Sequence, residues 1–149
     1  IVGAAHGESN ELFSASLQAR VLGSGYADRF HFAGFRSDVP AVMKAIDILA
    51  VPSWNEPFGR VAVEGMAAGC AVVGTNVGGL PEIITNGVDG LLVSPRDVDA
   101  LAAALYRLST DSGLRQRLSE RGQHTAQRFT IVKHVEQIQA LYDAVLSVC

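Results

Sequence analysis

Short, continuous apolar runs that alternate with helical patterns are the feature of this sequence that most restricts its fold. Three such runs read as strands, over residues 47–52, 70–75 and 91–94. A strand that is apolar at every position has both faces covered, which is typical of a parallel sheet between helices. Strands that alternate with helices are joined by right-handed crossovers. The sequence therefore predicts an α/β fold with a doubly wound, Rossmann-like parallel sheet.

Helices are expected on either side of these strands, because apolar residues recur there at helical spacing. Pro40 falls in a first turn, where its missing N–H is tolerated, and Gly69 suits the end of a helix. A short aromatic strand is expected over residues 29–34. The expected helices cover residues 9–22, 38–46, 59–69, 78–84, 97–109, 111–129 and 130–147.

The size and composition of the chain predict one compact domain over residues 1–149. Hydrophobic residues make up 48% and charged residues 18% of the chain, which is unlike a disordered segment. The net charge is −3, and without a basic excess a nucleic-acid partner is disfavoured. The opening at Ile1 reads as the end of a strand, so we expect earlier strands to lie upstream.

The expected location of the protein follows from targeting signals and cysteine usage. No apolar run approaches about 18 residues, so no membrane span is expected, and no signal peptide is recognised. Cys70 lies in an apolar run and Cys149 is the last residue, so a stabilising disulfide is not expected. These features predict a cytoplasmic protein or one at the cytoplasmic face of a membrane.

Three loops follow predicted strands and should meet at the carboxyl edge of the sheet, where open α/β folds bind ligands. Phe58 and Gly59 open one helix, and Gly78 and Gly79 open the next. Unpaired N–H groups at helix starts favour anions, and glycine allows close approach to the backbone. Two neighbouring helix starts suit a ligand rich in phosphate and hydroxyl groups. The three loops cover residues 34–37, 52–59 and 75–79.

Two carboxylates flank the start of the helix expected over residues 59–69. This helix is apolar on nearly every side and reads as buried, yet it contains Glu64. An unpaired buried carboxylate is costly, so Glu64 needs a partner, either two hydroxyls of a ribose or Arg60, four residues earlier. Glu56 lies in the loop before the helix. It either contacts a ligand or serves as an acidic partner of the helix dipole.

Glu56 and Glu64 form an E-x(7)-E pattern within the segment PSWNEPFGRVAVEGMAAGCAVVGTNVGGLPEII, residues 52–84. FHFAGFRSDVPAVMKAIDILAVPS leads into this segment, and NGVDGLLVSPRDVDALAAALYRL follows it. In this order the motifs resemble the signature of retaining glycosyltransferases of the GT-B fold, in the large family four group. The resemblance covers essentially the whole chain.

The resemblance implies that the chain is most of the C-terminal, donor-binding domain of a two-domain enzyme. Glu64 is then expected to bind the nucleotide ribose, and Glu56, the candidate catalytic residue, to contact hydroxyls of the donor sugar. Further donor-binding candidates are the backbone N–H groups of Phe58, Gly59 and Arg60, Phe35 and Arg36 beside the base, and Gly78, Gly79 and Glu82.

The reaction implied by the resemblance is transfer of a sugar from a nucleotide sugar, with retention at the anomeric carbon. The protein then acts mainly by positioning and charge stabilisation. The donor is a UDP-, GDP- or ADP-sugar, and the acceptor is not specified. No cofactor or metal is expected, since the four histidines show no metal-ligand spacing. A non-catalytic nucleotide-sugar module and a GT-B sugar-nucleotide epimerase are the alternatives.

Parts of the family's site are expected to lie outside the chain, among them the basic pair that clamps the diphosphate and the acceptor domain. The chain alone should therefore transfer no sugar and bind a donor weakly at best. An apolar face left open favours self-association, and a peripheral membrane contact would belong to the missing domain. Trp54, beside the site loop, either packs or stacks on a sugar.

Overall fold

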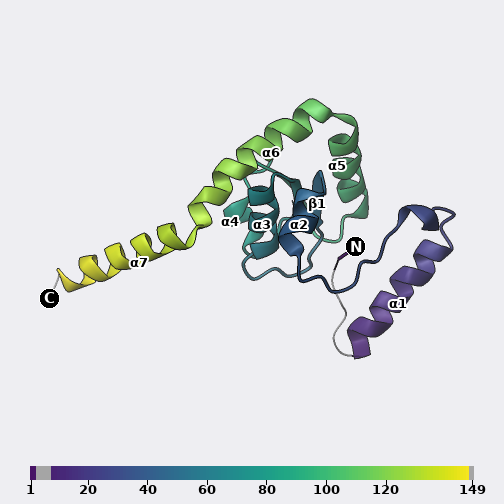
Figure 1. Cartoon of the computed structure of the whole chain (residues 1–149), viewed down its shortest axis with the longest axis horizontal. Coiled ribbons are helices and arrows are strands. Elements are labelled where there is room, and N and C mark those ends of the chain that lie inside the picture. Colours follow the sequence, from purple (N-terminus) through teal and green to yellow (C-terminus); the bar gives the residue numbers. More distant parts are fainter. Residues whose placement is uncertain (3–7, 148–149) are drawn as a thin grey trace. The chain divides into compact units, whose positions relative to one another are not determined.

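The fold is described from a computed structural model that covers residues 1–2 and 8–147 (Figure 1). Two compact units divide the chain, Ile1–Val39 and Pro40–Cys149, and each is described by itself. The expectation of one domain over residues 1–149 stays a prediction.

The first unit contains the predicted first helix, α1 (Glu8–Leu22), and a short helix η1 (Ala27–Arg29). The strand expected over residues 29–34 is wrong as a regular strand. Ile1 donates its terminal N–H to the His31 carbonyl at 2.7 Å, and Ala33 donates to the Ile1 carbonyl at 2.8 Å. Only an isolated parallel bridge joins Val2 to Gly34. Among the described residues, the pairing consists of these few bonds, which do not make a ladder.

The second unit is built on a parallel sheet with the strand order β1-β2-β3. The three predicted strands are confirmed as β1 (Ile48–Val51), β2 (Ala71–Thr75) and β3 (Leu91–Val93). Ile48 lies opposite Ala71, and Val73 opposite Leu91. β2 is the central strand and is buried at all five positions, as its apolar sequence predicts.

The helices of this unit begin and end close to their predicted limits. Side-chain caps explain three of the starts, because Asp97, Asp111 and Thr130 each accept the N–H of the residue three positions later. Gly69 ends its helix in the left-handed conformation, at φ 93°. The elements are α2 (Val39–Lys44), which begins at the unit boundary, α3 (Arg60–Ala68), α4 (Leu80–Ile83), α5 (Val98–Thr110), α6 (Ser112–Ala126), η2 (Gln127–Phe129) and α7 (Ile131–Leu146).

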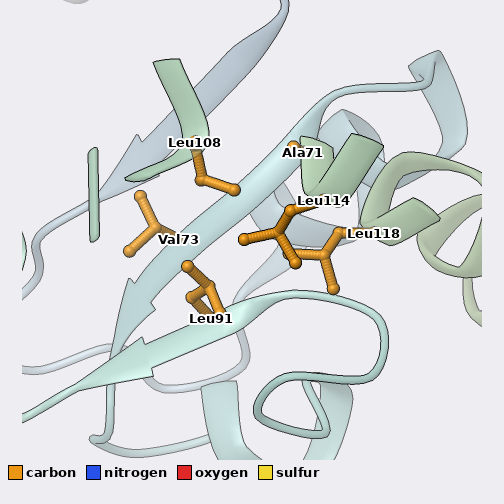
Figure 2. Close-up of a cluster of buried hydrophobic side chains, with 6 residues drawn as sticks. All are labelled: Ala71, Val73, Leu91, Leu108, Leu114 and Leu118. Atoms are coloured by element: carbon orange, nitrogen blue, oxygen red, sulfur yellow. The ribbon is translucent and has the colours of Figure 1, made fainter. Parts of the chain in front are cut away.

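Helices cover both faces of the sheet, which confirms the doubly wound arrangement. On one face, leucines of α5 and α6 pack on alternate residues of β2 and β3, as Figure 2 shows for Ala71, Val73, Leu91, Leu108, Leu114 and Leu118. On the other face, the Leu49 side chain lies against Gly65 of α3, and a Cβ on Gly74 would lie 3.3 Å from Leu80 of α4.

Helix α3 is buried along one side only, which corrects the expectation of a helix buried all round. Ala62, Gly65 and Met66 face the interior. Val61 and Glu64 lie on the exposed side. The apolar composition of the helix misled the prediction, because small and aliphatic residues occupy both its inner and its outer positions.

Two loops meet backbone to backbone at the carboxyl edge of the sheet, one between β1 and α3 and the other between β2 and α4. The Gly79 N–H donates to the Glu56 carbonyl at 2.9 Å. A Cβ on Gly78 would collide with that same carbonyl, and a Cβ on Gly79 would collide with the Phe58 carbonyl. Gly78 also has a φ of 53°. The two glycines therefore let the loops approach.

Substitution of Gly78 by alanine should destabilise the protein more than the same substitution at Gly87. Both glycines have positive φ, 53° and 78°, so both variants carry a left-handed alanine that costs about 1 kcal/mol. Only at Gly78 does the new methyl group meet backbone, whereas nothing lies within 4 Å at Gly87. We expect Gly78→Ala to lose at least about 1 kcal/mol more than Gly87→Ala in urea unfolding. Equal losses would contradict the loop packing described here.

Candidate functional site

The Glu56 carboxylate lies across the N-terminal end of α3. Its Oε1 accepts the Gly59 N–H at 3.1 Å, and its Oε2 accepts the Ser53 hydroxyl at 3.1 Å. A carboxylate at this position stabilises the helix dipole, as one of the two interpretations of Glu56 expects. Contact between Glu56 and a donor sugar stays a prediction.

At the start of α3, one backbone N–H group is already hydrogen-bonded within the protein and others have no acceptor. Gly59, the N-cap residue at φ 95°, already donates to Glu56. Among the described residues, the Phe58 and Arg60 N–H groups have no acceptor. An open N–H is the ordinary condition at the start of a helix. Of the three expected backbone donors, Phe58 and Arg60 are thus open to a ligand, whereas Gly59 would have to exchange Glu56 for one.

Glu64 is paired with Arg60, as the second of its two interpretations expects. Glu64 Oε1 lies 3.3 Å from Arg60 Nε, and the two side chains are 45% and 85% exposed. The premise of a buried, unpaired carboxylate is therefore wrong, because Glu64 lies on the outer side of α3. An ion pair this exposed contributes about 0–1 kcal/mol, so Arg60 does not hold Glu64 firmly.

The second helix start, expected at Gly78 and Gly79, does not offer the Gly79 N–H to an anion. The Gly79 N–H is taken by the Glu56 carbonyl, and α4 has only four residues. Glu82 is exposed on α4. The structure gives the two glycines a packing role, and contact of these three residues with a donor stays a prediction.

The Phe58 side chain connects the site loop with η2, the turn between α6 and α7. Phe58 is 54% exposed, and its ring meets Phe129 of η2 edge to face, with the centroids 6.1 Å apart. Such aromatic pairs add about 0.5–1.5 kcal/mol beyond burial. The η2 turn therefore supports the loop that carries Glu56.

Phe35 and Arg36, expected beside the base, belong to the first unit. Phe35 is 76% exposed. Arg36 donates to both oxygens of Asp38, at 2.8 and 2.6 Å, and this hydrogen bonding lowers the pKa of Asp38. Their contribution to a site shared with Glu56 and Glu64 stays a prediction.

Sequence reasoning missed two hydroxyl groups at the strand ends. Thr75 closes β2 and donates its hydroxyl to the Ser53 carbonyl at 2.5 Å, and Ser53 in turn donates to Glu56. The available signal was position, because Thr75 is the last residue of one predicted strand and Ser53 directly follows another. Trp54, left open between packing and stacking, lies under the Arg96 guanidinium, 5.4 Å from the ring centroid.

The pockets of the second unit include two that are lined by described residues of the strand ends and of α6. One of about 110 Å³ is lined by Trp54, Thr75 and Arg96 at the strand ends. A larger one of about 460 Å³ lies between Asp89 and α6 and contains none of the candidate residues. Of these two pockets, the smaller one adjoins the loop that carries Glu56.

Other features of the described residues concern metals, membranes and cysteine. Within residues 1–2 and 8–147, no group of three His, Cys, Asp or Glu side chains is arranged to hold a metal ion. In the same part of the chain, each helix is too short or too polar to cross a membrane. Cys70 is a free thiol, and burial raises its pKa. Cys149 lies outside the described residues.

Known proteins match nearly the whole chain. The family described as glycosyl transferases group 1 matches residues 1–125. D-inositol 3-phosphate glycosyltransferase of Corynebacterium jeikeium is 38% identical over 141 residues, which cover 95% of this chain and 34% of that protein. The same enzyme of Corynebacterium aurimucosum is 35% identical over 99% of this chain and 35% of its own. The chain thus spans about a third of the length of these relatives.

Solved structures share the fold. Anabaena Alr3699/HepE in complex with UDP matches 96% of this chain and 40% of its own, with a TM-score of 0.89 and 33% identity. The C-terminal domain of the glycosyl transferase group 1 family protein LpcC from Francisella tularensis matches 78% of this chain and 62% of its own, with a TM-score of 0.73 and 33% identity. The predicted fold class, the C-terminal half of a GT-B architecture, is confirmed. On these matches the chain belongs to the glycosyl transferases group 1 family.

Proposed function

We propose that this chain is the donor-binding part of a retaining glycosyltransferase, which transfers a sugar from a nucleotide sugar to an acceptor. The observation that carries the proposal is the E-x(7)-E pair at the start of α3. It places Glu56 on the helix N-terminus and Glu64 on the exposed side of the helix. Membership of the glycosyl transferases group 1 family supports the reaction type.

The geometry supports binding of different parts of a donor by different groups at the start of α3. The open Arg60 N–H and the helix dipole favour the anionic part of a donor. Glu64 can leave its weak pair with Arg60 and accept two ribose hydroxyls. Glu56 keeps acceptor positions for hydroxyls of the donor sugar. The reaction then needs little from the protein beyond orientation and charge stabilisation, while the leaving phosphate helps to deprotonate the acceptor.

Related structures indicate which ligands to test first. The Anabaena protein was crystallised with UDP, with UDP and glucose, and with UDP-glucose, so UDP-sugars precede GDP- and ADP-sugars as candidate donors. D-inositol 3-phosphate is the first acceptor to test, because several relatives carry its name. A metal-free reaction, a cytoplasmic location, a peripheral membrane contact and self-association stay predictions. So do the two alternatives, a non-catalytic module and an epimerase.

Replacement of Glu64 by alanine should weaken nucleotide binding. Loss of hydrogen bonds to a charged acceptor costs about 1.5–3 kcal/mol, so the dissociation constant for UDP should rise roughly tenfold or more. An NMR titration measures the affinity even where it is millimolar. Glu136→Ala is the matched control, because Glu136 is also an exposed helical glutamate paired with a cation, Lys133 at 2.9 Å. Unchanged UDP affinity in Glu64→Ala would remove Glu64 from the ribose site.

The 149-residue chain alone should show no steady sugar transfer from UDP-glucose to D-inositol 3-phosphate. The chain corresponds to about a third of the length of its relatives, so any acceptor site built from the remainder is absent. Release of UDP, followed with a coupled assay, gives the rate, and spontaneous hydrolysis of UDP-glucose provides the baseline. Sustained turnover above this baseline would show that the chain is a complete enzyme.

A further inference from the structure

We propose that Ser53 and Thr75 are positioning residues that orient the Glu56 carboxylate toward the donor sugar. The proposal rests on the proposed function for the role of Glu56, and on a chain of hydrogen bonds for its geometry. Thr75 Oγ1 donates to the Ser53 carbonyl at 2.5 Å, and Ser53 Oγ donates to Glu56 Oε2 at 3.1 Å.

Thr75 is the buried residue at which this series of hydrogen bonds begins. It is 4% exposed and closes β2, which is buried at every position. The last paired residues of β1 and β2 are Val51 and Gly74, so the Thr75 hydroxyl joins the two segments just beyond the ladder. A buried hydroxyl without an acceptor is costly, which ties Thr75 to the Ser53 carbonyl. The core of the sheet thereby sets the position of Ser53.

Ser53 in turn orients the Glu56 carboxylate through its hydroxyl group. One oxygen of Glu56 accepts the Ser53 hydroxyl and the other accepts the Gly59 N–H. Because each oxygen accepts one hydrogen bond, rotation of the carboxylate plane is restricted. A carboxylate has about four acceptor positions, so about two remain for hydroxyl groups of a ligand. Without Ser53 only the Gly59 bond would orient the group.

The first test needs no ligand and measures hydrogen exchange of the Gly59 amide relative to the Val73 amide in β2. Ser53→Ala and Thr75→Val should lower the relative protection of Gly59 by roughly three- to tenfold, the effect of losing about one hydrogen bond. Ser53→Thr and Thr75→Ser keep the hydroxyl and should restore it.

Two control variants remove comparable hydroxyl bonds elsewhere in the same unit. In Ser119→Ala the bond to the Gly69 carbonyl, 2.6 Å long, is lost. In Thr125→Val the bond to Asp89, 2.7 Å long, is lost. Both should leave the relative protection of Gly59 unchanged. An equal fall in Gly59 protection in the controls would overturn the positioning role of Ser53 and Thr75. The absence of such a fall in Ser53→Ala and Thr75→Val would overturn it as well.

The second test compares the affinities for UDP-glucose and for UDP, which lacks the sugar. In Ser53→Ala and Thr75→Val the dissociation constant for UDP-glucose should rise roughly three- to tenfold, while that for UDP changes less than about twofold. A purely structural defect would weaken both ligands alike, so the ratio of the two constants is the readout.

The outcomes separate the two proposals. A wild-type chain that binds neither UDP nor UDP-glucose at millimolar concentration would overturn the donor-binding role proposed for this chain. The exchange test would still decide whether Ser53 and Thr75 orient Glu56. A wild-type chain that favours UDP-glucose, with the same preference in Ser53→Ala, would overturn positioning by Ser53 and leave the proposed function standing. Equal affinity of the wild-type chain for both ligands would show that Glu56 is not oriented toward a donor sugar.

Discussion

The contact between two loop backbones at the carboxyl edge of the sheet is the constraint on which the candidate site depends. The Gly79 N–H meets the Glu56 carbonyl, and the lack of a side chain at Gly78 leaves room for that carbonyl. Since the main chain of Glu56 is held from this side, its carboxylate is free to cover the start of α3 and accept the Gly59 N–H. The positions of the side chains in the candidate site therefore depend on the close approach of the two loop backbones.

Below this contact, the central strand β2 links the core of the unit to the candidate site. Its side chains alternate between the α5 and α6 face and the α3 and α4 face, so both layers of helices pack on one buried element. The strand ends at Thr75, whose hydroxyl reaches the loop that carries Glu56. The exposed pair of Glu64 and Arg60 contrasts with this rigid base, because it is solvated and can exchange partners at little cost.

Much of the fold could be predicted because its signals are local. Unbroken apolar runs marked β1, β2 and β3, and capping residues such as Asp97 and Gly69 marked helix ends. The strand over residues 29–34 was wrong as a regular strand, because among the described residues it pairs through an isolated bridge and a few bonds, and composition does not reveal how far a segment is paired. For the site, the sequence located the E-x(7)-E pair but misjudged the burial of Glu64, since Ala and Val suit either side of a helix.

The parallel α/β class, the order of the elements and the loops of the candidate site could be read from the chain's residues, because these depend on periodicity and on single residues. The use of the polar groups in the candidate site could be seen only in the folded protein. Gly79 donates to Glu56 instead of staying open, and Ser53 and Thr75 join the site. The physical reason is that hydrogen bonds between loops depend on the distance between two backbones, and that distance is set by the packing of the strands beneath them.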